Sequence, residues 1–366
     1  MKISSKVKKA ARALIFFLIL ILMLGGMSDV LRVKSPGRAA NGFYDMKSGQ
    51  CDVVMLGPSM IQQGCFPLEL WKDHGITAYN LGSGNQSPIA SYHFAKEAIE
   101  KQHPKLIIVE CGQFRMRKTA LKTSYIHYLT DNMPFFSQNR LSLIADYSKE
   151  ANIKTEDTIG LFVPLTLYHS NWKKLTKKYF TEDVKNKTCG ARISTKIDSQ
   201  VDVFGEVEVN PSFELPDRSS RYLEKLMDLC DETGTELLLI MMPIPGATKY
   251  VSFGSFKRRY NTMEAIKRIA SERGYNAVNL LASYDELGID PQHDTKDGQH
   301  LNYWGGVKFT SWLGSYLKEN YALEDHRDDP GYKAYQDAYE IYRDYIDSKL
   351  GDTEADAEAE AEEDEI

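Results

Sequence analysis

The fold of this chain can be inferred from one run near its start, Cys51-Asp52-Val53-Val54-Met55-Leu56-Gly57-Pro58-Ser59. Residues 52–56 are mostly apolar, and a short run of this kind is typical of a strand buried on both faces of a parallel sheet. Gly57 and Pro58 permit a sharp exit from the strand, which would expose the hydroxyl group of Ser59. We therefore predict a parallel strand with a serine directly beyond its carboxyl end.

Similar apolar runs recur along the chain and alternate with helical patterns. Four further strands are predicted at residues 77–81, 106–109, 237–242 and 277–281. Helices are predicted at residues 66–73, 88–102, 220–232, 262–273 and 304–317. This alternation predicts an α/β fold, a flavodoxin-like three-layer sandwich in which helices cover both faces of a central parallel sheet.

The alternation breaks between residues 115 and 216, inside a domain that we place at residues 51–325. This segment is rich in lysine and aromatic residues, and it is too long for an ordinary loop. We predict a mostly helical insertion that covers the site or forms a partner surface. Its aromatic side chains, among them Trp172, Tyr179 and Phe180, are candidates for a wall that stacks on sugar rings; packing in a small satellite core is the alternative.

The amino-terminal segment has the composition of a membrane anchor. Residues 1–12 contain five basic residues and no acid, and residues 13–24 contain no polar side chain. The positive-inside rule places the basic end in the cytoplasm. A membrane span needs about 20 residues, so the crossing would also use the residues that follow the apolar run. We predict a transmembrane helix and uncleaved anchor at residues 1–31, a linker at 32–50 and an extracytoplasmic domain at the cell membrane. A signal peptide cleaved after Ser28 and a buried core helix are the alternatives.

The carboxyl-terminal region has two parts. Five tyrosines recur at helical spacing within residues 326–350, which predicts a helix that docks on the domain or presents an aromatic stripe to a partner or glycan. Residues 351–366 contain nine acidic residues and no basic one, and we predict a disordered acidic tail. Without these residues and the first twelve, the chain holds 40 basic and 42 acidic residues, a balance that gives no support for nucleic-acid binding.

The five cysteines are an odd number and lack the Cys-x-x-Cys spacing of metal sites. Cys51 and Cys111 flank predicted strands and are expected to be small buried side chains. We expect no disulfide framework, and the sequence indicates no metal and no cofactor.

Ser59 has a candidate base far along the chain, where Asp297-Gly298-Gln299-His300 precedes the predicted helix at 304–317. A serine hydroxyl is a poor nucleophile until a base accepts its proton. His300 is the predicted base, and Asp297 would hold its imidazole in one tautomer. The alternatives are a helix-capping role for Ser59 and a metal site made of His293, Asp294, Asp297 and His300, whose spacing fits no familiar zinc motif.

Turns after the second and third strands hold candidate donors for an oxyanion hole. Gly82 and Gly84 allow backbone N–H groups to approach a substrate oxygen, and Asn85 or Gln86 would add a side-chain donor. Gln113 follows the third strand and is a further candidate. The alternative for each is an ordinary glycine-rich turn.

Four segments in this order resemble the blocks of the SGNH (GDSL-like) hydrolase superfamily. Ser59 matches the first block, Gly82 or Gly84 the second, and Asp297 with His300 the fifth, while Gln113 lies near the third. The resemblance covers about residues 51–115 and 217–320. Two departures occur: Pro58 stands where the family commonly has Asp or Ser, and Gly112-Gln113-Phe114 replaces Gly-x-Asn-Asp.

With an amino-terminal anchor, the chain resembles a membrane-tethered branch of that superfamily, the DltD-type proteins of teichoic acid D-alanylation and the AlgJ/AlgX-like proteins of polysaccharide O-acetylation. This resemblance implies an acyltransferase or esterase that works beside a membrane-bound O-acyltransferase. The acyl group would pass through Ser59 to or from a cell-envelope polysaccharide or teichoic acid. The alternative is a non-catalytic accessory or polymer-binding protein on the same scaffold.

Overall fold

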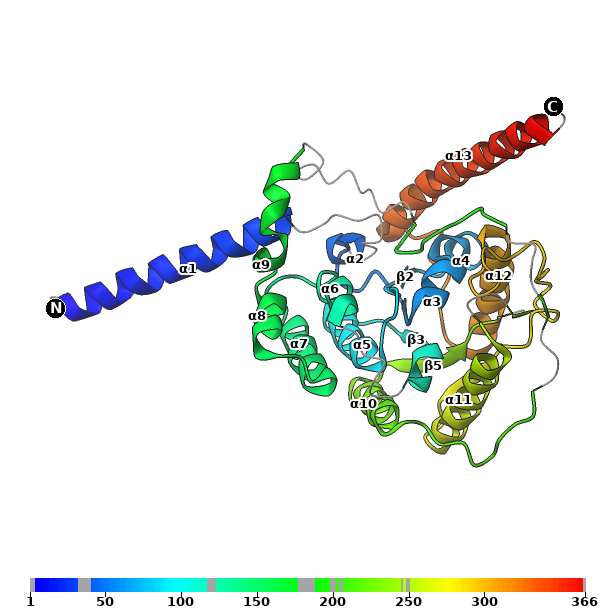
Figure 1. Ribbon diagram of the computed structural model, residues 1–366, viewed down its shortest axis with the longest axis horizontal. Coiled ribbons are helices and arrows are strands. Elements are labelled where there is room, and N and C mark those ends of the chain that lie inside the picture. Colours follow the sequence, from blue (N-terminus) through cyan, green and yellow to red (C-terminus); the bar gives the residue numbers. More distant parts are fainter. Residues whose placement is uncertain are drawn as a thin grey trace.

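A five-stranded sheet in which every neighbouring pair is parallel forms the centre of the computed structural model (Figure 1). The strands, in the order β2-β1-β3-β5-β7, are β1 (Val53–Leu56), β2 (Ala78–Asn80), β3 (Leu106–Glu110), β5 (Glu236–Met241) and β7 (Asn276–Asn279). Each strand lies within a predicted run or extends one residue beyond it. The structure describes residues 4–31, 41–116, 123–176, 188–197, 202–203, 207–244, 246–247 and 251–364.

Helices cover both faces of this sheet. α5 (Pro88–Gln102) packs against α10 (Asp217–Thr233), and α4 (Pro67–His74) packs against α12 (Tyr303–Asn320). Right-handed crossovers between parallel strands place the first pair on one face and the second pair on the other. α11 (Phe253–Glu272) packs along the edge strand β7. The predicted three-layer α/β fold is therefore confirmed.

The insertion is largely helical in its described residues. It contains α6 (Thr123–Thr130), α7 (Gln138–Ala151), α8 (Thr155–Phe162), α9 (Leu165–Tyr168) and the 3-10 helix η3 (His169–Lys174). α7 packs on α5 and so adds helices outside the sandwich. Further on, β4 (Asp202–Val203) pairs antiparallel with β6 (Gly246–Ala247), which joins the insertion to the segment after β5.

The aromatic residues of the insertion do not form a described wall. Trp172 is 61% exposed and so is not packed in a core. Its ring centroid lies 5.9 Å from Lys173 Nζ. Tyr179 and Phe180 lie outside the described residues. The sugar-stacking wall stays a prediction.

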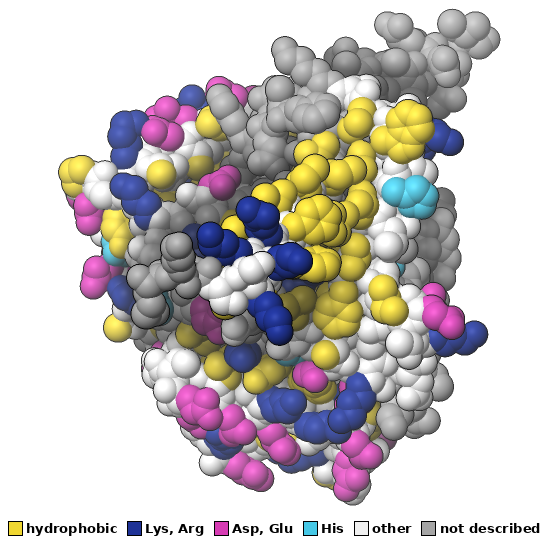
Figure 2. All heavy atoms as spheres, turned by 90° about the vertical axis from the view of Figure 1, so that its left-hand side faces the viewer, with side chains coloured by type: hydrophobic (Ala, Val, Ile, Leu, Met, Phe, Trp, Pro, Cys, Tyr) yellow, Lys and Arg dark blue, Asp and Glu magenta, His cyan; other side chains and the backbone are white. Residues whose placement is uncertain are grey.

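α1 (Ser5–Leu31) is the one helix of the described residues that is long and apolar enough to cross a membrane. Only 6% of its most apolar window is buried, which contradicts the alternative of a buried core helix. Figure 2 faces the side from which α1 projects and shows a field of apolar side chains with lysine and arginine side chains gathered beside it. The end of α1 meets the insertion, where Asn171 Nδ2 donates to Leu31 O at 2.9 Å.

The carboxyl-terminal helix α13 (Lys333–Asp364) docks on α4, as one of the two predictions for the tyrosine stripe expected. Tyr335 stacks on Trp71 with 5.4 Å between ring centroids, and Tyr342 Oη donates to Glu69 Oε1 at 2.9 Å. The helix continues to Asp364, through the acidic run for which we expected disorder. Alternating alanine and glutamate have high helix propensity, which accounts for this difference.

All five cysteines are buried with free thiols, in agreement with the expected absence of a disulfide framework. Burial raises the pKa of the Cys65 and Cys189 thiols to about 12. These thiols are therefore protonated and unreactive near neutral pH.

Candidate active site

Ser59 is the first residue of α3 (Ser59–Gly64), three residues beyond the end of β1. The turn depends on Gly57, whose φ is +136°. A Cβ at this position would lie 2.8 Å from Glu110 Cβ and 3.0 Å from the Glu110 carbonyl oxygen on β3. Only glycine combines this backbone conformation with so close an approach of two strand ends. The turn therefore places Ser59 at the carboxyl edge of the sheet, between β1 and β3.

Gln86 fixes this turn from the side of β2. Its Oε1 accepts from the Gly57 N–H at 2.7 Å and from Ser91 Oγ at 3.1 Å. Its Nε2 donates to Leu81 O at 2.9 Å and to Ser83 Oγ at 3.1 Å. All of its hydrogen-bonding capacity is used within the fold, so Gln86 positions the turn and is not available as an oxyanion donor.

Ser59, His300 and Asp297 form a continuous hydrogen-bonded chain. Ser59 Oγ lies 2.8 Å from His300 Nε2, and His300 Nδ1 lies 3.0 Å and 2.9 Å from the two carboxylate oxygens of Asp297. Pro58 occupies the N-cap position of α3, so Ser59 does not cap the helix. The hydroxyl group of Ser59 thus bonds the imidazole, the geometry that base activation of a serine requires.

Asp297 is held ionised by its neighbours. Burial acts to raise its pKa, but the hydrogen bond and electrostatic attraction of His300 and the N–H groups of Gln299 and His300 outweigh burial, and the pKa lies below its usual value. The two N–H groups donate to Asp297 Oδ1 at 3.1 Å and 2.8 Å. A fixed carboxylate keeps the Nδ1 proton of His300 on its own side and leaves Nε2 facing Ser59.

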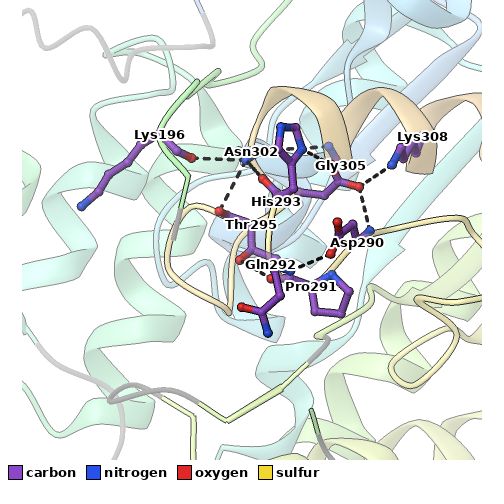
Figure 3. Close-up of polar contacts among 10 residues, drawn as sticks. Lys196, Asp290, Pro291, Gln292, His293, Thr295, Asn302, Gly305 and Lys308 are labelled. Carbon is purple, nitrogen blue, oxygen red and sulfur yellow. Dashed lines mark hydrogen bonds and ion pairs between the residues drawn. The ribbon is translucent and has the colours of Figure 1, made fainter. Parts of the chain in front are cut away.

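The loop that carries Asp297 and His300 is anchored by Asn302, which is fully buried (Figure 3). Its Nδ2 donates to the carbonyl oxygens of His293 at 2.6 Å, Lys196 at 3.3 Å and Thr295 at 3.4 Å. Its Oδ1 accepts from the Gly305 N–H at 3.2 Å and so caps α12. One side chain therefore ties the loop to both the helix and the insertion.

Asp294 is the second buried anchor of this loop. Its Oδ2 accepts from Lys308 Nζ at 2.6 Å and from the Asp290 N–H at 2.8 Å, while Oδ1 lies 2.8 Å from His293 Nδ1. Burial acts to raise the pKa of Asp294, yet these partners hold it below its usual value. The loop thus has a buried ion pair of its own in addition to the backbone hydrogen bonds that Asp297 accepts.

The four residues considered as metal ligands divide into two separate pairs. His293 bonds Asp294, and His300 bonds Asp297. Across the described segments, no group of three or more His, Cys, Asp or Glu side chains is arranged to hold a metal ion. The four side chains serve the loop and the serine instead.

The turn after β2 lies against Gly57, because the Ser83 N–H donates to Gly57 O at 3.0 Å. Gly82 is not a free donor there, since its N–H donates to Asn80 Oδ1 at 3.0 Å and a Cβ would lie 2.6 Å from Ile61 Cγ2. We therefore leave Gly82 out of the oxyanion donors. Gly84 and Asn85 are exposed in the same turn, and Asn85 adopts a φ of +57°.

Gln113 lies three residues beyond β3, in the short helix η1 (Gly112–Arg115). It is 8% exposed, and its Oε1 is buried without a hydrogen-bond partner in the described part of the chain. The Gly57–Glu110 contact brings the ends of β1 and β3 together, which places Gln113 near the nucleophile. Its role as an oxyanion donor stays a prediction.

Several residues that shape the site were not predicted. Asn80 Nδ2 donates to Ile61 O at 2.8 Å and to Cys65 O at 3.0 Å, so it fixes the middle of α3 and the residue that follows it. Asn302, two residues after His300, was not predicted to have a role either. An Asn at a strand end or just before a helix is the signal that would have found both, because such amides satisfy free backbone groups.

Comparisons with known proteins add little to this geometry. No protein-family model and no curated protein match the chain. A solved structure of a proposed acylhydrolase from Bacteroides fragilis is 11% identical, covers 78% of this chain and 99% of its own, and has a TM-score of 0.38. A proposed arylesterase from Agrobacterium tumefaciens is 10% identical over 75% of this chain and 99% of its own, with a TM-score of 0.34. At these values the hydrogen-bonded chain itself is the stronger observation.

Proposed function

We propose that this protein is a serine-dependent acyl-ester transferase or esterase of the SGNH type, with Ser59 as nucleophile. The observation that carries the proposal is the chain from Ser59 Oγ to His300 Nε2 at 2.8 Å and from His300 Nδ1 to Asp297 at 2.9 Å. Three residues from opposite ends of the sequence meet there, at the edge of a parallel sheet where ligands bind.

In the proposed reaction Ser59 Oγ attacks the acyl carbonyl while its proton passes to His300 Nε2. The alcohol leaves with that proton, and the acyl group stays on Ser59 as an ester. An acceptor hydroxyl, or water in the esterase reaction, then gives its proton to His300 and takes the acyl group, and His300 returns the proton to Ser59 Oγ as the ester bond breaks. The free N–H groups at the start of α3 and in the Gly84–Asn85 turn are the proposed oxyanion donors, each worth about 3 kcal/mol in comparable sites.

The proposed setting is the outer face of a membrane. α1 supplies a helix of sufficient length, and the basic residues at its start favour a cytoplasmic amino terminus. Following the resemblance stated above, we propose O-acyl groups of a cell-envelope polysaccharide or teichoic acid as the substrate and a membrane-bound O-acyltransferase as the partner.

The test is trapping of the acyl-enzyme. Full-length protein in detergent micelles is mixed with 4-nitrophenyl acetate, and the acetylated residue is located by peptide mass spectrometry. We expect acetyl on Ser59 and none in Ser59→Ala, whereas Ser315→Ala, an exposed serine on α12, behaves as wild type. Folded wild type that never acquires acetyl would refute the proposal and favour the non-catalytic accessory role.

A further inference from the structure

Two arginines whose guanidinium groups make no hydrogen bond in the described residues, Arg115 and Arg259, lie beyond β3. This strand is the neighbour of β1, which leads to Ser59. Arg259 is on the second turn of α11 and is 5% exposed, and its Nε is buried without a hydrogen-bond partner in the described residues. Arg115 ends η1, directly after β3, and is half-buried. Within the described ranges, neither guanidinium makes a hydrogen bond or ion pair, although η1 packs against α11. Buried guanidinium groups without partners are costly, which makes them a signal of a missing ligand.

The nearest carboxylate, that of Glu110, attracts both arginines but forms no ion pair with either in the described residues. Glu110 Oε1 and Arg259 Nη1 both come within 3.1 Å of the point where a Cβ on Gly112 would lie, yet they do not form an ion pair. Glu110 Oε2 instead accepts from the Gly112 N–H at 3.0 Å, and Oε1 has no partner in the described structure. Burial raises the pKa of Glu110, whereas the charge of Arg259 acts to lower it.

The local charge is therefore positive. Burial first, then the charge of Arg259, lowers the pKa of Arg115 to about 10, and exposed Arg258 adds to this repulsion. Two arginines, Arg115 and Arg259, thus share the one carboxylate of Glu110. An anion placed between Arg115 and Arg259 would relieve the repulsion and satisfy their N–H groups, which match the oxygens of a phosphate or carboxylate in geometry.

The position of this pair points to the substrate of the proposed reaction. Gly57, two residues before Ser59, lies against Glu110 at the end of β3, and neighbouring strands are about 4.8 Å apart. We propose that Arg115 and Arg259 form a binding site for an oxyanion, a phosphate or carboxylate group carried by the substrate that is acylated or deacylated at Ser59. The assignment of the anion to the substrate rests on the proposed function, whereas binding of the anion does not.

Direct binding tests this proposal without catalysis. Inorganic phosphate and acetate are each titrated by calorimetry into full-length protein in detergent micelles, in chloride buffer of constant ionic strength. We expect wild type to bind one of the two anions. Ser59→Ala should bind the same anion with the same affinity. Arg115→Gln is expected to bind it at least about tenfold more weakly, the order expected for losing one charge-assisted hydrogen bond. Arg343→Gln, an exposed arginine on α13, is the matched control and should bind as wild type.

The outcomes are separable. Preferential binding of phosphate assigns a phosphorylated substrate, and preferential binding of acetate assigns a carboxylate. Arg115→Lys keeps the charge but loses the planar fork, so it should be intermediate and decides the matter if Arg115→Gln does not fold. Wild type that binds neither anion, or Arg115 variants that bind as tightly as wild type, would overturn the proposal. Anion binding by Ser59→Ala together with an absence of acyl-enzyme in wild type would refute the proposed function but would still support the anion-binding site.

Discussion

Replacing Gly57 by alanine tests how the site is built. The φ of +136° belongs to a region that is essentially restricted to glycine, and a side chain there costs about 1–3 kcal/mol. The new Cβ would also lie 2.8 Å from Glu110 Cβ and 3.0 Å from its carbonyl oxygen, and overpacking of this kind costs about 1–3 kcal/mol more. Because Leu56 pairs with Val109 in the same two strands, the backbone has little room to move apart.

We therefore expect Gly57→Ala to lower the free energy of unfolding by about 2–6 kcal/mol, a large part of the stability of a typical domain. Urea denaturation of full-length protein in micelles, followed by tryptophan fluorescence, measures this loss as a lower midpoint. Gly254→Ala is the matched control, because nothing lies within 4 Å of a Cβ at that helical position. A Gly57→Ala midpoint equal to that of wild type would refute the close approach of β1 and β3 at this turn.

Three further outcomes follow from the described contacts. Asn302→Ala should lower the free energy of unfolding by about 2–4 kcal/mol, whereas Asn302→Ser, which retains an oxygen for the helix cap, should lower it by about 1 kcal/mol less. Equal urea midpoints for the two variants would refute the capping role of Asn302. The pKa of Asp297 is lowered in the folded state, so the stability it contributes is present above its unfolded pKa of about 3.9 and is lost as the pH falls through the folded value. The stability gap between wild type and Asp297→Asn should therefore stay constant above about pH 5 and shrink as the pH falls from about 4 toward the lower folded pKa, and a gap that widens on acidification would contradict this. Tyr342→Phe removes the hydrogen bond to Glu69 and should cost about 1.5–3 kcal/mol in the same denaturation assay, and a neutral effect would show that α13 docks through its rings alone.

The sheet was predictable because its strands are buried on both faces. Runs such as Leu106–Glu110 are apolar at nearly every position, so neither periodicity nor tertiary context is needed to find them. The start of α11 was missed: the helix begins at Phe253, not near residue 262, although Ser252 caps it by accepting from the Ser255 N–H. Its first two turns are polar or exposed on most positions, and a weak apolar pattern conceals a helix that tertiary packing stabilises.

The candidate site was predictable only in part. Ser59, Asp297 and His300 were chosen from residue type and order, and the structure brings them within hydrogen-bonding distance. The oxyanion candidates could not be ranked from sequence, because the availability of an N–H group depends on contacts between segments. Gln86 shows this, since its side-chain oxygen is taken by the N–H of Gly57, 29 residues earlier in the chain, whereas the N–H of Gly82 is taken locally by Asn80.

The most direct measurement of the central claim, that His300 activates Ser59, is labelling of full-length protein with a fluorophosphonate probe. Wild type, Ser59→Ala, His300→Gln and the control Ser315→Ala are compared in micelles, with circular dichroism confirming that each is folded. The account predicts one labelled residue, Ser59, in wild type and Ser315→Ala, and no labelling in the other two variants. Labelling of His300→Gln at the wild-type rate, or folded wild type that does not react, would contradict it.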